Sequence, residues 1–176
     1  MDFSRLETNI METIKEEQIK LGYRREVIRL YYPLKSLNRF LGTRLHREEM
    51  QALLDEFKEQ VRDTLGRIGV DVDGKRFCFL IPEEGVAYVH EHTEPSDFLY
   101  DLIHTVSRHG ITIQDVLDQF YRHSEHVHVQ KMEHDDYDYL VYFEDGVPDD
   151  FRYCLTDEGP HIIYHRFTRE DYQDFL

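Results

Sequence analysis

The chain has little cysteine and no long hydrophobic run. Its 176 residues include two cysteines, Cys78 and Cys154, which are too few for a secreted disulfide framework and lack the paired spacing of a zinc knuckle. We expect both to be free thiols in strands. No apolar stretch approaches the roughly 20 residues needed to cross a bilayer, and residues 1–18 lack the apolar core of a signal peptide. These absences predict a cytoplasmic protein with no membrane partner.

The sequence also lacks the common catalytic signatures. It has no HExxH motif, no nucleophile elbow, no phosphate-binding glycine loop and no dinucleotide fingerprint. The acidic doublets Glu83-Glu84, Asp135-Asp136 and Asp149-Asp150 fall at predicted turns or strand ends, where adjacent side chains point in opposite directions. We interpret them as turn and solubility residues rather than acid and base pairs. No motif identifies a reaction, which favours a non-catalytic protein.

Acidic residues and histidines are concentrated in one part of the chain. Residues 1–69 hold 13 Lys and Arg against 12 Asp and Glu, whereas residues 70–176 hold 8 against 24 and contain ten of the eleven histidines. Such an acidic surface repels nucleic acid and anionic lipid and attracts cations and basic proteins. We therefore expect no nucleic-acid partner for it, and a basic protein is the partner that the charge favours.

The apolar periodicity predicts a single α+β domain. Residues 1–69 form a mainly helical, near-neutral layer, and an internal boundary at Gly69 leads to an acidic, histidine-rich part with the sheet, residues 70–176. Helices are expected at Ser4–Leu21, Leu34–Leu41, Arg47–Leu65, Ser96–Arg108 and Thr112–Arg122, with Thr168 capping a short last helix. Strands are expected at Glu26–Tyr32, in a β-hairpin of Phe77–Ile81 and Val86–Glu91, and in a carboxy-terminal antiparallel meander at His126–Lys131, Tyr137–Glu144, Phe151–Thr156 and His161–Phe167.

One segment is distinctive enough to suggest a family. The run LGYRREVIRLYYPLKSLNRFLGT, from Leu21 to Thr43, with the preceding TIKEEQIK, resembles the amino-terminal part of an uncharacterised bacterial family of about this length, a domain of unknown function. The resemblance implies a bacterial cytoplasmic protein. It carries over no activity, cofactor or catalytic residue.

Histidines in the predicted strands suggest a metal site. Residues two apart on a strand share a face, so His126 and His128 point together, as do His90 and His92 if their strand continues that far. Imidazole suits Zn, Ni, Cu or Fe, and acidic surroundings attract divalent cations. A divalent transition metal is therefore the one cofactor to consider. The alternative is that these histidines are solvated, because valines alternate with them as the inward residues.

The same part of the chain is rich in tyrosine. Tyr137, Tyr139 and Phe143 are expected on one face of their strand, and Leu140 and Tyr142 on the other, as in a central strand covered on both sides. Tyrosines left exposed on an acidic surface would suit protein binding. The sequence thus favours a non-catalytic interaction module whose acidic, Tyr-rich surface binds a basic protein. The alternative is a metal-dependent enzyme that uses strand histidines.

A second charged segment lies in the amino-terminal half. Basic residues interleaved with tyrosines would suit nucleic acid, but this half is almost neutral overall, which favours intramolecular pairing or solvation. The residues are Arg24, Arg25, Arg29, Lys35, Arg39, Arg44 and Arg47.

Overall fold

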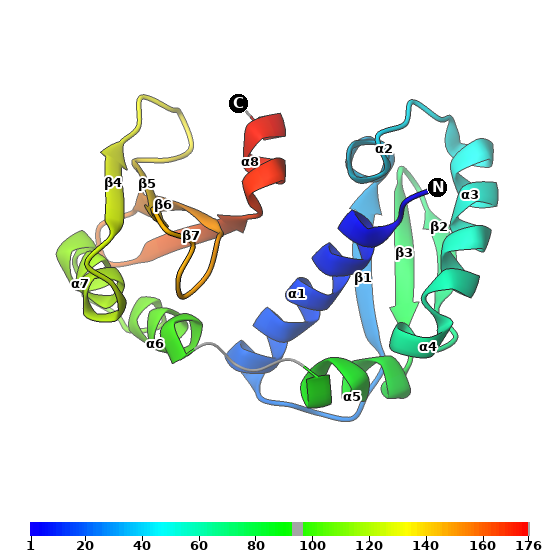
Figure 1. Ribbon diagram of the computed structural model, residues 1–176, viewed down its shortest axis with the longest axis horizontal. Coiled ribbons are helices and arrows are strands. Elements are labelled where there is room, and N and C mark those ends of the chain that lie inside the picture. Colours follow the sequence, from blue (N-terminus) through cyan, green and yellow to red (C-terminus); the bar gives the residue numbers. More distant parts are fainter. Residues whose placement is uncertain (93–96, 176) are drawn as a thin grey trace. The chain divides into compact units, whose positions relative to one another are not determined.

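The computed structural model describes residues 1–92 and 97–175, which belong to two compact units (Figure 1). We call Met1–Glu94 the first unit and Pro95–Leu176 the second unit. Both combine an antiparallel sheet with helices, so the predicted α+β class is confirmed. The start of a helix predicted at Ser96 lies outside the described residues.

The first unit contains a three-stranded antiparallel sheet with the strand order β1-β3-β2. Leu30 of β1 and Val70 of β2 both lie opposite Phe79 of β3, on the face that the helices cover. Because strands from before and after residue 69 share this sheet, the charge boundary at Gly69 is not a boundary between packed units. The strands are β1 (Ile28–Pro33), β2 (Gly69–Asp73) and β3 (Arg76–Ile81).

Within residues 1–92, five helices complete the first unit, and two match their predicted bounds. These are α1 (Ser4–Leu21) and α2 (Leu34–Leu41). The single helix predicted over Arg47–Leu65 is instead two helices, α3 (Arg47–Gln60) and α4 (Arg62–Leu65), because the backbone of Val61 has a ψ of 8° and ends the helical repeat. The apolar side chains of α1 and α3 belong to one core with the sheet.

The predicted hairpin of Phe77–Ile81 and Val86–Glu91 is wrong. Strand β3 pairs with β2 through a turn at Gly74, where φ is +61°, and the later segment forms α5 (Glu83–His92). The run Val86 to Val89 is too short for the spacing of its apolar residues to distinguish a strand from a helix. Both valines are fully buried and three residues apart, which is a helical spacing.

The second unit has the predicted antiparallel meander, in the order β4-β5-β6-β7. Helices α6 and α7 pack on one face of this sheet, and Thr112 caps α7 by accepting a hydrogen bond from the amide of Asp115. Thr168 accepts one from the amide of Asp171, 3.1 Å away, as its predicted capping role requires. The elements are α6 (Asp97–Val106), α7 (Ile113–His123), β4 (Val127–Lys131), β5 (Tyr139–Phe143), β6 (Arg152–Asp157), β7 (Ile162–Phe167) and α8 (Arg169–Phe175).

Candidate functional site

The two faces of the second sheet are covered to different extents. On the inner face, Val141 and Phe143 of β5 are fully buried with the aromatic rings of α6 and α7. On the outer face, Leu140, Cys154 and Tyr172 of α8 form a smaller buried cluster. Strand β5 is therefore central and covered on both faces, as predicted, although the outer cover is partial.

Two half-buried tyrosines lie at the margin of that outer cluster, Tyr137 and Tyr142. The sequence places Tyr137 on the same face as Tyr139, but β5 begins at Tyr139, so the alternation does not extend back to Tyr137. Tyr137 packs on the outer cluster instead, whereas Tyr139 packs on the inner one. The structure thus brings Tyr137 and Tyr142 to the same face.

Histidines and one arginine contact these tyrosines. The imidazole of His128 stacks on Tyr142 with ring centroids 4.6 Å apart, and the guanidinium of Arg152 lies 4.0 Å from the Tyr142 ring centroid. Tyr137 contacts His134 and His165 at centroid distances of 5.3 and 5.5 Å. His128 and His134 are therefore stacking partners of tyrosine, whereas His165 meets Tyr137 edge-on.

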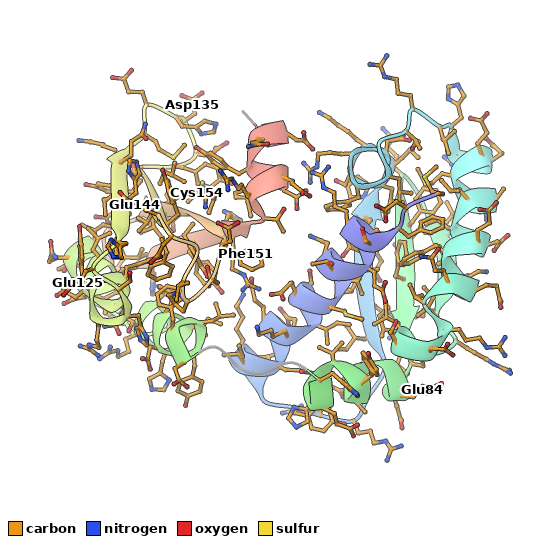
Figure 2. All side chains as sticks on the ribbon, in the orientation of Figure 1. Glu84, Glu125, Asp135, Glu144, Phe151 and Cys154 are labelled. Carbon is orange, nitrogen blue, oxygen red and sulfur yellow. The ribbon has the colours of Figure 1, made fainter. Side chains whose placement is uncertain are left out.

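Carboxylates surround the tyrosines. Glu144 Oε1 lies 3.9 Å from His128 Nδ1, and Asp150 Oδ1 lies 3.4 Å from an Arg152 guanidinium nitrogen; both carboxylate side chains are more than half exposed. Asp135 and Asp136 are also exposed. Figure 2 labels Glu144 and Asp135 on the side of the unit that β4 forms. We call this surface the acidic aromatic face, and its residues are Tyr137, Tyr142, Asp135, Asp136, Glu144 and Asp150.

The negative charge of the chain is divided unequally between the two units. The second unit holds 6 Lys and Arg against 18 Asp and Glu, a net of −12, whereas the first holds 15 against 18, a net of −3. Most of the negative charge therefore belongs to the unit that carries the acidic aromatic face.

Strand β4 ends the second sheet, and its outer edge pairs with no strand of the described chain. The amide of Glu144 donates to the carbonyl of His126, and the amide of Met132 donates to the carbonyl of Asp138, both at 2.8 Å. In an antiparallel ladder this alternation directs the backbone groups of every second residue away from the partner strand. Those residues of β4 are Val127, Val129 and Lys131.

The histidines predicted to bind metal lie in different kinds of element. His126 precedes β4, so only His128 lies within the strand predicted for the pair. His90 and His92 lie on the helix α5, so the strand predicted for them is wrong. Residues two apart on a helix point in different directions, so these two histidines do not share a face. His90 stacks on Tyr23 with ring centroids 3.9 Å apart, and His92 Nδ1 lies 2.9 Å from the carbonyl oxygen of Tyr88.

No three His, Cys, Asp or Glu side chains within residues 1–92 and 97–175 are grouped so that they could hold one metal ion. The proposed metal role of His126, His128, His90 and His92 stays a prediction.

Neither cysteine is a candidate nucleophile in the folded protein. Cys78 in β3 and Cys154 in β6 are buried free thiols, as predicted. Burial raises the pKa of Cys154 from 9.0 to about 11, so little thiolate forms near neutral pH. Burial also raises the pKa of Tyr153, whose hydroxyl donates a 2.7 Å hydrogen bond to Asp149. We assign the Cys154 thiol and the Tyr153 side chain to the core.

The fold and this surface define an α+β protein with an acidic, aromatic carboxy-terminal face, and comparison with known proteins gives its family. The chain belongs to DUF3877, described as a domain of unknown function, E. rectale gene description, which matches residues 3–176. The resemblance predicted from Leu21 to Thr43 to a domain of unknown function is thereby confirmed. No curated protein and no solved structure matches the chain. None of the helices in the described ranges is sufficiently long and apolar to span a membrane.

Proposed function

We propose that this protein is a non-catalytic interaction module that binds a basic protein through the acidic aromatic face. One observation carries the proposal. Tyr137 and Tyr142 lie half-buried among exposed carboxylates in a unit with three times as many acidic as basic residues, 18 against 6. Tyrosine supplies a large contact area at low entropic cost. Complementary charge speeds association and excludes acidic competitors.

The free edge of β4 supplies the kind of contact that an extended segment needs. Outward backbone groups of Val127, Val129 and Lys131 can form a ladder with a partner strand, the mode by which many domains bind peptides. Exposed carboxylates lie near the amino-terminal end of β4: Glu125 precedes the strand, and Glu144 lies 3.9 Å from His128 (Figure 2). A segment in which Lys alternates with a β-forming residue would satisfy the backbone groups and the carboxylates together.

The test is the binding of a 12-residue peptide of alternating Lys and Thr to the full chain, measured by titration calorimetry. A charge-reversal variant of the face, Asp135→Lys, Asp136→Lys and Glu144→Lys, is expected to weaken binding at least about tenfold. The matched control reverses three exposed carboxylates of the first unit, Glu48→Lys, Glu56→Lys and Asp63→Lys. This control makes the same change in net charge and should alter affinity less than about twofold.

Two results would contradict the proposal. Equal losses in both variants would mean that the peptide responds only to net charge, and undiminished binding in the face variant would place binding elsewhere. Metal content tests the alternative of a metal-dependent enzyme. About one equivalent of a transition metal that is lost when His126 and His128 are both changed to Ala would favour the enzyme.

A further inference from the structure

A second surface lies in the first unit and is independent of the proposed function. A pocket of about 250 Å³ lies at one end of the first sheet, between the start of α2, the start of α3 and the turn that joins β2 to β3. In Figure 1 these three segments meet at the upper end of the unit. The lining residues are Leu34, Arg47, Val72, Gly74, Lys75, Arg76 and Phe77.

The inner wall of this pocket is apolar. Phe77 is 2% exposed, and Leu34 and Val72 are partly buried against the same core. A polar ligand without an apolar part would gain little from these side chains, because none of the three offers a hydrogen-bond donor or acceptor. The wall therefore favours a ligand with an apolar body.

The rim of the pocket is cationic. Arg47, Lys75 and Arg76 line it, and no carboxylate in the described ranges does. Arg76 is held by Asp73, 3.6 Å away, and by the ring of Tyr31, whose centroid lies 4.7 Å from the guanidinium carbon. Arg47 and Lys75 make no ion pair within the part of the chain that the structure describes. Their charge is available to a ligand.

The amino terminus of α3 does not add to this charge. Arg47 is the first residue of α3, but Glu48 and Glu49 lie in the same turn, and Glu49 accepts a 2.9 Å hydrogen bond from the amide of His46, so carboxylates already oppose the positive end of the helix dipole. The contacts open to an anionic group are therefore the side chains of Arg47 and Lys75, and such charge-assisted contacts are stronger than neutral ones.

We infer that this pocket binds a small organic carboxylate with a short apolar body. The apolar wall receives the body, and Arg47 and Lys75 receive the carboxylate. The volume of about 250 Å³ lies below the roughly 300–1,000 Å³ of pockets for drug-sized ligands, so the ligand is small. An amine of the same shape is repelled by the rim, and an alcohol of the same shape lacks the ionic contact.

The probes are hexanoate, 1-hexanol and hexylamine, titrated into the full isotope-labelled chain while amide chemical shifts are recorded. Hexanoate should cause saturable shifts at Gly74 and Lys75. Its affinity should exceed that of hexanol by about tenfold, because two exposed ionic contacts together contribute about that factor. Hexylamine should cause none. Equal binding of hexanol and hexanoate, or hexanoate shifts without saturation at these amides, would overturn the inference.

A charge-reversal pair identifies the residues responsible. Arg47→Glu with Lys75→Glu should remove measurable hexanoate binding, and the neutral pair Arg47→Gln with Lys75→Gln should weaken it about tenfold. The neutral pair keeps the test valid if the reversed pair does not fold.

The matched control uses another cationic site of the same unit, lined by Lys58, Arg62 and Arg67, where Glu59 pairs with Arg62 at 3.3 Å. The variant Arg62→Glu with Arg67→Glu makes the same change in net charge and should leave hexanoate affinity within about twofold of the original. An equal loss in this control would show a response to net charge alone and would overturn the inference.

Discussion

At the scale of single residues, Gly85 permits close packing of α5 on α4. A Cβ atom at this position would lie 2.3 Å from the carbonyl oxygen of Leu65, which is backbone and cannot move aside cheaply. We expect Gly85→Ala to lower the free energy of unfolding by about 2–3 kcal/mol, as overpacking of a core does. Denaturant unfolding measures it.

Gly42→Ala is the control for that change. Gly42 has left-handed α backbone angles, φ 64° and ψ 32°, and open space around it, so an alanine there costs only the backbone strain of about 1 kcal/mol. If Gly85→Ala proved no more destabilising than Gly42→Ala, the helix α5 would be free to shift and the packing argument would fail.

The buried thiol of Cys154 gives a prediction of pH dependence. Its folded-state pKa of about 11 exceeds the ordinary 9.0, so the unfolded chain loses this proton first as pH rises. The stabilisation is complete below pH 9.0 and is lost between pH 9.0 and about 11. Because the thiol is buried, we expect no alkylation of Cys154 at pH 8 in the native state and rapid alkylation in urea. Mass spectrometry of the labelled protein measures both. Labelling at equal rates in both states would contradict its burial.

At the scale of elements, a single substitution can test whether the free edge of β4 binds the peptide. Val129→Pro removes an outward backbone N–H while the ladder with β5 remains. We expect the fold to persist and binding of the Lys-Thr peptide to weaken about tenfold, since a ladder bond is lost and the edge is obstructed. Val129→Ala shortens the same side chain and keeps the N–H. Equal binding by both variants would mean that the peptide does not add a strand to β4.

Element boundaries show where pattern reasoning was sufficient. Helices α1 and α2 match their predicted bounds because glycines follow them directly, at Gly22 and Gly42. The break at Val61 carries no glycine or proline signal, and the apolar run in α5 is too short for its spacing to distinguish a helix from a strand. In both cases the local sequence is compatible with two structures, a continuous or a broken helix at Val61 and a strand or a helix at α5, and tertiary packing selects between them.

At the scale of the whole molecule, net charge is unevenly divided, with −12 on the second unit and −3 on the first. Repulsion among like charges destabilises a compact state, and salt screens it. We expect the melting temperature to rise as NaCl increases from about 0.05 to 0.5 M, over which the Debye length falls severalfold. Scanning calorimetry measures this rise.

The control for the salt effect is the face variant with Asp135, Asp136 and Glu144 changed to Lys. Because its second unit carries less net negative charge, its melting temperature should rise less with salt. An equal rise in both proteins would mean that the salt effect does not come from this concentration of charge.

The sequence by itself determined the α+β class, the carboxy-terminal meander, the family resemblance and the excess of acid, because periodicity, turn residues and composition are local properties. Only the tertiary structure decided that β1 pairs with β3 across Gly69, that Tyr137 joins Tyr142 on one face, and that Arg47 and Lys75 meet around an apolar pocket. These contacts join residues distant along the chain, and packing, not local propensity, selects them.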